Sequence, residues 1–185
     1  MMLEIYFETY GCTANYNSTE IMKGLVRQAE LNITQNENYA DLIVINSCIV
    51  KAPTQEKIRR RIQVLLKKHK RIILAGCMPQ INKKSLVNID GLYLLDTTHI
   101  KDIVNLIQDI NDGSCDSLKY LKQRNEVKSN LPKISKEKLI GINQISEGCL
   151  GECSYCIVKF AKGKLFSYPK DKIIESIKND LQAGA

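Results

Sequence analysis

The sequence has no apolar run close to the ~18 residues that a membrane-spanning helix needs, so no membrane segment is predicted. Its first residues, Met1-Met2-Leu3-Glu4, contain neither a basic stretch nor a long apolar one. We therefore expect no signal peptide and a cytoplasmic protein. It also has no internal repeat and no low-complexity tract. These absences leave a globular chain that is long enough for one domain and part of a second.

Cysteine and positive charge are the features that the chain does have. Seven cysteines in a chain without export signals favour metal ligation over disulfides, because the cytosol keeps thiols reduced. The net charge is +7 and the pI is near 9.0. This balance suits a polyanionic partner such as nucleic acid, and it is equally compatible with plain solubility.

The sequence alternates between short apolar, β-favouring runs and amphipathic segments of helical spacing. The runs cover residues 3–7, 42–45, 72–74 and 92–95, and the helical segments begin at Asn17, Pro53 and Ile100. This alternation predicts an α/β fold, with a mostly parallel sheet flanked by helices, over residues 1–112. Residues 113–138 lose the periodicity and predict a linker.

A second domain is predicted over residues 139–185. A strand over residues 140–145 leads into a short loop, and a helix then runs from about Tyr168 to Gly184. The apolar positions of this helix are expected to face inward, namely Ile173, Ile174, Ile177 and Leu181.

Three cysteines lie on the loop between this strand and helix, in the spacing C-x3-C-x2-C. Cys149, Cys153 and Cys156 cannot all pair with one another in disulfides, but their thiolates can hold one metal centre. A closed zinc site or a cubane cluster takes four protein ligands. Residues 139–185 contain no fourth cysteine or histidine, so one metal corner is expected to stay open. A zinc knuckle or three buried hydrophobic thiols are the alternatives.

Three other cysteines, far apart in the sequence, each follow a predicted strand. They are Cys12, Cys48 and Cys77. The carboxyl ends of parallel strands share one edge of a sheet, where ligands bind, so these thiols are expected to converge there. Three small buried hydrophobic side chains are the alternative. Cys115, in the predicted linker, is expected to be an incidental thiol.

Both cysteine groups resemble those of the radical S-adenosylmethionine methylthiotransferase family. The loop with Tyr155 before its last cysteine is similar to the superfamily hallmark, and three earlier segments are similar to the family's auxiliary-cluster segments: residues 8–15, 46–48 and 75–77. The resemblance implies one [4Fe–4S] cluster on Cys12, Cys48 and Cys77. It implies a second on Cys149, Cys153 and Cys156, which would be the catalytic cysteines and would bind S-adenosylmethionine, with Tyr155 near the cofactor adenine.

Within this family, residues 8–13, 49–54 and 148–153 look most like the archaeal and eukaryotic branch. That branch acts on N6-threonylcarbamoyladenosine in tRNA. The resemblance implies methylthiolation of carbon 2 of this nucleoside, with tRNA and an electron-donor protein as partners. The basic surface Arg59–Lys70 is a candidate tRNA contact, and a solvated charged face is the alternative.

The chain continues only from Cys156 to Ala185 after this loop, whereas a (β/α) barrel takes about 200 residues or more. The sequence therefore predicts the first βα unit of an incomplete radical S-adenosylmethionine barrel, poorly anchored, in a truncated chain that is inactive alone. Three further functions stay open: methylthiolation of another tRNA adenosine or of a ribosomal protein, a non-catalytic iron–sulfur electron-transfer module, and a zinc-stabilised RNA-binding module.

Overall fold

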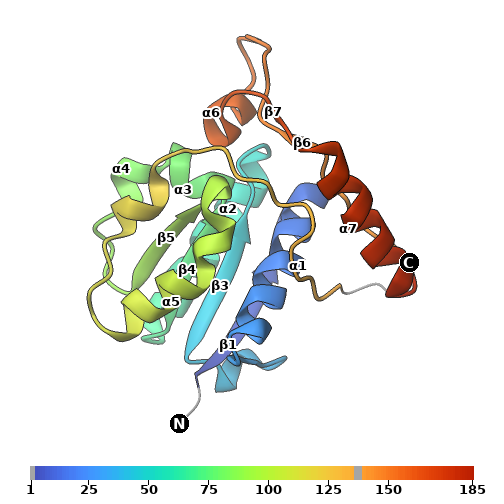
Figure 1. Cartoon of the computed structure of the whole chain (residues 1–185). Helices are drawn as coiled ribbons and strands as arrows, with labels where there is room; N and C mark the ends of the chain where they lie inside the picture. The colour runs from blue at the N-terminus through green and yellow to red at the C-terminus, as the bar shows by residue number, and fades with distance from the viewer. Residues whose placement is uncertain (1–2, 136–138) are drawn as a thin grey trace.

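The computed structural model describes residues 3–135 and 139–185, and its centre is a five-stranded sheet (Figure 1). The strands are β1 (Glu4–Thr9), β2 (Asn32–Ile33), β3 (Leu42–Ser47), β4 (Arg71–Gly76) and β5 (Leu92–Asp96). Their order is β2-β1-β3-β4-β5, and every neighbouring pair is parallel. The predicted α/β fold with a parallel sheet is confirmed.

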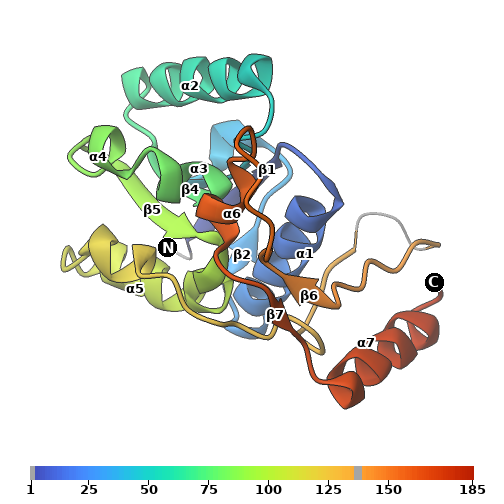
Figure 2. The same cartoon turned by 90° about the horizontal axis from the view of Figure 1, so that it is seen from above.

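Helices cover both faces of this sheet (Figure 2). One face carries α1 (Thr13–Gln28) and α5 (Ile103–Asn111), and the other carries α2 (Ala52–Lys67), α3 (Cys77–Ile81) and α4 (Lys83–Leu86). The structure also has three short 3-10 helices: η1 (Glu37–Tyr39), η2 (Thr97–Asp102) and η3 (Ser117–Leu121).

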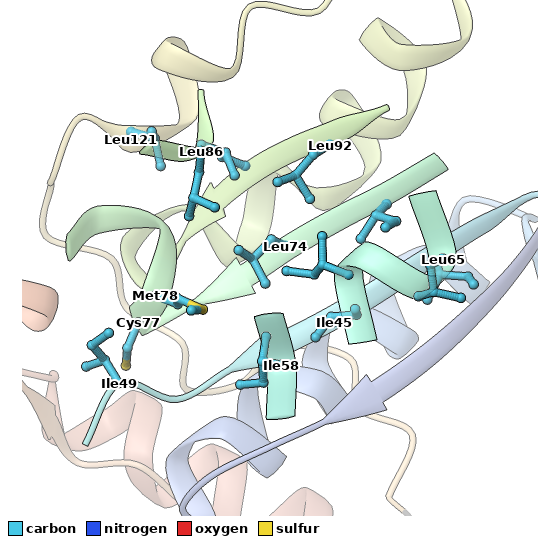
Figure 3. Close-up of a cluster of buried hydrophobic side chains, with 14 of the residues drawn as sticks. Ile45, Ile49, Ile58, Leu65, Leu74, Cys77, Met78, Leu86, Leu92 and Leu121 are labelled. Atoms are coloured by element: carbon cyan, nitrogen blue, oxygen red, sulfur yellow. The ribbon is translucent and has the colours of Figure 1, made fainter. Parts of the chain in front are cut away.

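The sheet has an apolar core on each face, because successive side chains of a strand point to opposite sides. In β3, Ile43 and Ile45 pack in the core beneath α2, whereas Leu42 and Val44 pack in the core beneath α1 and α5. Every residue of β3 is buried, which explains its continuous apolar run. Figure 3 shows the core beneath α2, with Cys77 at one end of it.

Helix α1 begins earlier than predicted. Its N-cap residue is Cys12, not a residue near Asn17. Asn17 and Ser18 are buried inside the helix, so the predicted start at Asn17 is wrong.

The segment predicted as a linker packs on the α/β domain where it is described. Tyr120 and Leu121, in η3, are buried in the two cores, and Lys128 is 1% exposed. Residues 136–138, at the end of that segment, and residues 1–2 lie outside the described residues. The boundaries of the predicted domains stay a prediction.

The strand predicted over residues 140–145 is wrong. The chain pairs only at β6 (Ser146–Glu147), which is antiparallel to β7 (Phe166–Ser167). Ile140 and Ile145 are exposed. A strand needs partners for its backbone N–H and C=O groups, and in this stretch it is the Ile145 carbonyl that accepts such a bond, from the Tyr168 N–H at 2.9 Å.

The last helices are α6 (Val158–Lys162) and α7 (Lys170–Gln182), and the predicted α7 helix is confirmed. Its predicted inward stripe is wrong, because Ile174, Ile177 and Leu181 are exposed. The helix contacts the preceding segment through Asp180, whose Oδ2 accepts a hydrogen bond from Asn143 Nδ2 at 2.7 Å. Figure 1 shows α7 apart from the central sheet.

Within residues 3–135 and 139–185, no helix is both long and apolar enough to cross a membrane.

Candidate functional site

The first cysteine group lies at the carboxyl ends of three adjacent strands. Cys12 follows β1, Cys48 follows β3 and Cys77 follows β4 directly. Strand β2 lies on one side of β1, and the next strand in the chain, β3, lies on its other side. The direction in which strands are added to the sheet therefore reverses between β1 and β3. A crevice at such a switch point is where open α/β sheets bind ligands. The structure therefore brings the predicted residues to one edge.

A buried polar network supports these three positions. Asn15 Nδ2 donates to Asn46 Oδ1 and to the Ser47 carbonyl, each at 3.0 Å. Asn46 Nδ2 donates back to the Asn15 carbonyl at 2.7 Å and to Thr19 Oγ1 at 3.0 Å. Because α1 begins beside Cys12 and Asn46 precedes Cys48 by two residues, the amide pair fixes the first two cysteines relative to each other.

Ser47 extends this network to the third cysteine. Its hydroxyl donates to the Ala75 carbonyl at 2.6 Å and accepts from the backbone N–H of Met78 at 3.3 Å. Ala75 and Met78 flank Cys77 in the chain. A single buried serine thus ties the end of β3 to the start of α3.

Two glycines let the strand ends approach one another. Gly11 has φ +120°, and a Cβ on it would stand 2.7 Å from Cys48 Cβ. Gly76 has φ +93°, and its Cβ would meet Asn46 Oδ1 at 2.4 Å. Side chains at either position would push the cysteines apart, in a backbone region that only glycine adopts easily.

The three thiols differ in exposure. Cys12 is exposed, and its Sγ donates to Asn15 Oδ1 at 3.3 Å, whereas Cys48 and Cys77 are buried. Burial raises the pKa of the Cys77 thiol to about 11, and the Lys162 ammonium is the charge that opposes this rise. The group therefore has one thiol open to solvent and two set into the protein.

The second cysteine group lies on a loop that projects beyond α6 (Figure 1). Cys149, Cys153 and Cys156 line one hollow of about 380 Å³. Gly151 N donates to Cys149 Sγ at 3.2 Å, and a Cβ on Gly151 would stand 3.4 Å from Cys149 Sγ and 3.8 Å from Cys153 Sγ. The thiols of Cys149 and Cys153 thus both lie close to Gly151.

Tyr155 is 88% exposed, so it is not a core aromatic residue in this structure. Its predicted place beside a cofactor adenine stays a prediction. Cys115 lies with residues 87–93 near the start of β5, and burial raises the pKa of its thiol. It belongs to neither cysteine group.

The base of the second loop is held by a buried ion network. Glu147 accepts from Lys128 Nζ at 2.7 Å, from Thr97 Oγ1 at 2.8 Å and from Lys162 Nζ at 3.3 Å. Burial disfavours its charged form, but Lys128 and Lys162 outweigh this effect and lower the pKa of Glu147. The expectation of poor anchoring fails here, since Thr97 follows β5 directly and fixes the loop to the sheet edge.

Two cations of the predicted basic surface are engaged within the domain. Arg61 Nε donates to Glu8 Oε1 at 2.9 Å, and its guanidinium also pairs with Glu37. Lys70 Nζ donates to the Ala40 carbonyl at 2.7 Å. Arg59 is exposed. Arg61 and Lys70 therefore serve the fold, and the contact of this surface with tRNA stays a prediction.

The cysteine groups fit iron–sulfur clusters because thiolates are the ligands of such clusters. The positions of the described side chains alone do not define a metal site. Among the described residues, no three cysteine, histidine, aspartate or glutamate side chains are gathered closely enough for one metal ion. A single zinc needs its thiolates about 2.3 Å from the metal. A cubane cluster spreads its cysteine ligands over separate irons. The hollow of the second loop leaves room for such a group.

Sequence analysis missed the residues that hold the cysteines in place. Asn46 was visible only as part of a cysteine segment, and Asn15 as part of another. The sequence around Glu147 indicates only that it lies near Cys149. Lys128 lies in a lysine-rich stretch, which gives no sign that this lysine is buried. A signal existed for Asn46 alone, because an asparagine ending a fully apolar strand is polar where burial is expected.

Comparison with known proteins agrees with this architecture. Residues 4–95 match the family described as "Uncharacterized protein family UPF0004". They contain the whole parallel sheet and the first cysteine group up to β5. The α/β domain is therefore of this family.

Over nearly its whole length, the chain is similar to proteins named threonylcarbamoyladenosine tRNA methylthiotransferase. It is 33% identical to that of Danio rerio, over 99% of this chain and 34% of the relative, and 34% identical to that of Homo sapiens, over 98% and 32%. A "probable" member from Pyrococcus abyssi is 35% identical, over 99% and 43%. The chain thus spans about a third to two-fifths of these relatives. This similarity agrees with the methylthiotransferase family that its motifs indicated.

Proposed function

We propose that this chain is the cluster-binding part of a tRNA methylthiotransferase that acts on N6-threonylcarbamoyladenosine. One observation carries the proposal: three cysteines follow the carboxyl ends of adjacent strands, and three more line one loop hollow. Proteins similar over nearly the whole chain bear that enzyme's name. The activity of the whole protein is inferred from this similarity, with the cytoplasm as its compartment.

Two sets of residues would hold the cofactors. Cys149, Cys153 and Cys156 would bind one [4Fe–4S] cluster, whose open iron would take S-adenosylmethionine, and Cys12, Cys48 and Cys77 would bind the other. When bound, these groups supply electron transfer and the sulfur and methyl groups that side chains cannot provide. The side chains of this chain hold and orient: the Asn15–Asn46 pair sets the first group, and Glu147 anchors the second loop.

The first test is anaerobic reconstitution of the chain with iron and sulfide. Two cubane clusters predict about eight irons per chain. Replacing Cys12, Cys48 and Cys77 by alanine should remove half of the iron, and replacing the second group should remove the other half. Cys115→Ala is the matched control and should keep all of it. Binding of zinc without iron or sulfide would instead support the RNA-binding module.

The second test concerns activity and substrate. The full-length protein, given S-adenosylmethionine, a reductant and tRNA bearing N6-threonylcarbamoyladenosine, should form the 2-methylthio nucleoside, detected by mass spectrometry. Product only from another modified adenosine would overturn the substrate assignment. No cleavage of S-adenosylmethionine, with both clusters present, would favour an electron-transfer module. Replacing the reductant by candidate donor proteins, one at a time, would identify the electron donor.

A further inference from the structure

The short helix α6 connects the two cysteine groups. It packs against α3, whose first residue is Cys77. Ala161, in α6, is fully buried in the same core as Cys77 and Met78. Helix α6 also begins two residues after Cys156. One helix therefore touches the first group through its apolar face and continues directly from the second group.

Lys162, the last residue of α6, follows Ala161, which shares a core with Cys77, and pairs with Glu147 at the base of the second loop. Its Nζ lies 3.3 Å from Glu147 Oε1, and the side chain is 15% exposed. Glu147 stands two residues before Cys149, and the backbone N–H of Cys149 donates to the Gly163 carbonyl at 3.2 Å. The ammonium and the next peptide thus fix the base of the loop. Its charge also acts on the Cys77 thiol.

We propose that Lys162 is a positioning residue shared by the two cysteine groups. Its ammonium fixes Glu147 at the base of the second loop and places a positive charge beside the first group. The inference rests on the proposed function where it concerns a cluster, because a cluster held by three thiolates is the anion that this charge would face. It goes further in assigning one side chain to both sites.

Lys159 provides the matched control on the same helix. Its Nζ lies 3.4 Å from Glu152 Oε1, and the Glu152 side chain is 88% exposed. An ion pair with an exposed partner contributes little in water. Removal of the Lys159 charge therefore tests the general effect of a lost lysine on α6 without touching Glu147.

The first measurement is the midpoint potential of the cluster on the first group. The second group is replaced by alanine, so that one cluster remains. Lys162→Gln should shift the potential to a more negative value, because a nearby cation favours the reduced, more anionic state. Lys162→Arg should restore the wild-type potential, and Lys159→Gln should leave it unchanged. Equal potentials for the Lys162→Gln and Lys159→Gln variants would overturn the electrostatic role.

The second measurement uses the cluster-free chain and keeps the two proposals separable. Hydrogen exchange should become about tenfold faster or more in peptides covering residues 146–168 of the Lys162→Gln variant, because a hydrogen bond to a buried charge is lost. Peptides from β4 should exchange as in the wild type. Failure of the first group to take up iron would sink the proposed function and leave this result standing. Unchanged exchange over residues 146–168 would overturn the positioning role.

Discussion

At the scale of single residues, Asn46 is the side chain on which the first cysteine group depends most. An amide is both a donor and an acceptor, and Asn46 uses the two capacities at once inside the protein. No charged side chain could do the same without the free-energy cost of a buried charge. The residue therefore joins the end of β3 to the start of α1 without adding charge beside the thiols.

Asn46→Ala should lower the free energy of unfolding by about 2 kcal/mol, because it removes the buried hydrogen bonds that the Asn46 amide makes with Asn15 and Thr19. Urea unfolding followed by circular dichroism measures the change. Asn88→Ala, at an exposed position, is the control and should change it by less than about 0.5 kcal/mol. Equal effects of the two substitutions would show that the buried pair contributes nothing special.

Gly76→Ala should be strongly destabilising, by about 2 kcal/mol or more, because a Cβ would stand 2.4 Å from Asn46 Oδ1 in a backbone with φ +93°. Gly113→Ala provides a clean comparison. Gly113 also has positive φ, at +70°, but its Cβ would meet nothing within 4 Å. The difference between the two variants in thermal unfolding isolates the steric clash, and no difference would contradict the close approach.

At the scale of elements, the β6–β7 pair forms a neck beneath the second cysteine loop. Two residues from each strand hold it together, which is little backbone pairing for a projecting loop. Side chains complete the attachment: Glu147 enters the protein and meets Lys128, which is fully buried. The neck is therefore fixed by charge more than by backbone pairing.

Lys128→Met should lower the free energy of unfolding by about 3 kcal/mol, because it removes the closer of the two ammonium groups that pair with buried Glu147 and leaves only Lys162. The double variant Lys128→Met/Glu147→Gln should recover part of this loss, and a double-mutant cycle measures the coupling. Lys172→Met breaks the exposed pair with Glu175 and should change stability little. Strict additivity of the two buried substitutions would contradict the pairing.

The same network predicts a pH dependence. The pKa of Glu147 is lowered in the folded protein, so its ionisation contributes stability above the pKa of the unfolded chain, and this contribution is lost as pH falls. The gap in unfolding free energy between the wild type and Glu147→Gln should therefore be full at pH 7 and shrink below about pH 4. A gap that stays constant over this range would contradict the lowered pKa.

Elements with a strong internal pattern could be predicted from the sequence, and elements defined by their neighbours could not. The buried runs of β3 and β4 and the helix α5 followed from apolar spacing alone. Residues 140–145 carry a β-favouring composition without a partner strand, so composition misled. In α7 the apolar stripe is real, but its exposure depends on what lies opposite, which spacing does not encode.

At the scale of the whole molecule, part of the positive charge behind the net charge of +7 is used inside the protein. Arg61 and Lys70 are engaged with Glu8 and with backbone carbonyls. Two further cations, Lys128 and Lys162, lie inside the protein around Glu147. A composition count therefore overstates the charge that is available to a polyanion.

The two cysteine groups were predictable to different extents for a related reason. Ligand spacing identified Cys149, Cys153 and Cys156 directly, since the motif is local. Cys12, Cys48 and Cys77 required the order of the strands, which parallel topology supplied. The polar residues behind them stayed hidden, because burial of an asparagine or a lysine depends on distant partners that no single segment contains.

The sheet order β2-β1-β3-β4-β5 has a further consequence for how the two groups respond to unfolding. Cys12, Cys48 and Cys77 are neighbours only while β1, β3 and β4 are paired, so iron held there is coupled to the whole cooperative transition. The second group stays local in an unfolded chain. In a urea titration with an iron chelator, one half of the iron should leave in a sigmoidal step that coincides with the loss of circular dichroism, and the other half without such a step. The release of iron from the first group would thereby report the unfolding of the sheet, and release from the second group would serve as the comparison.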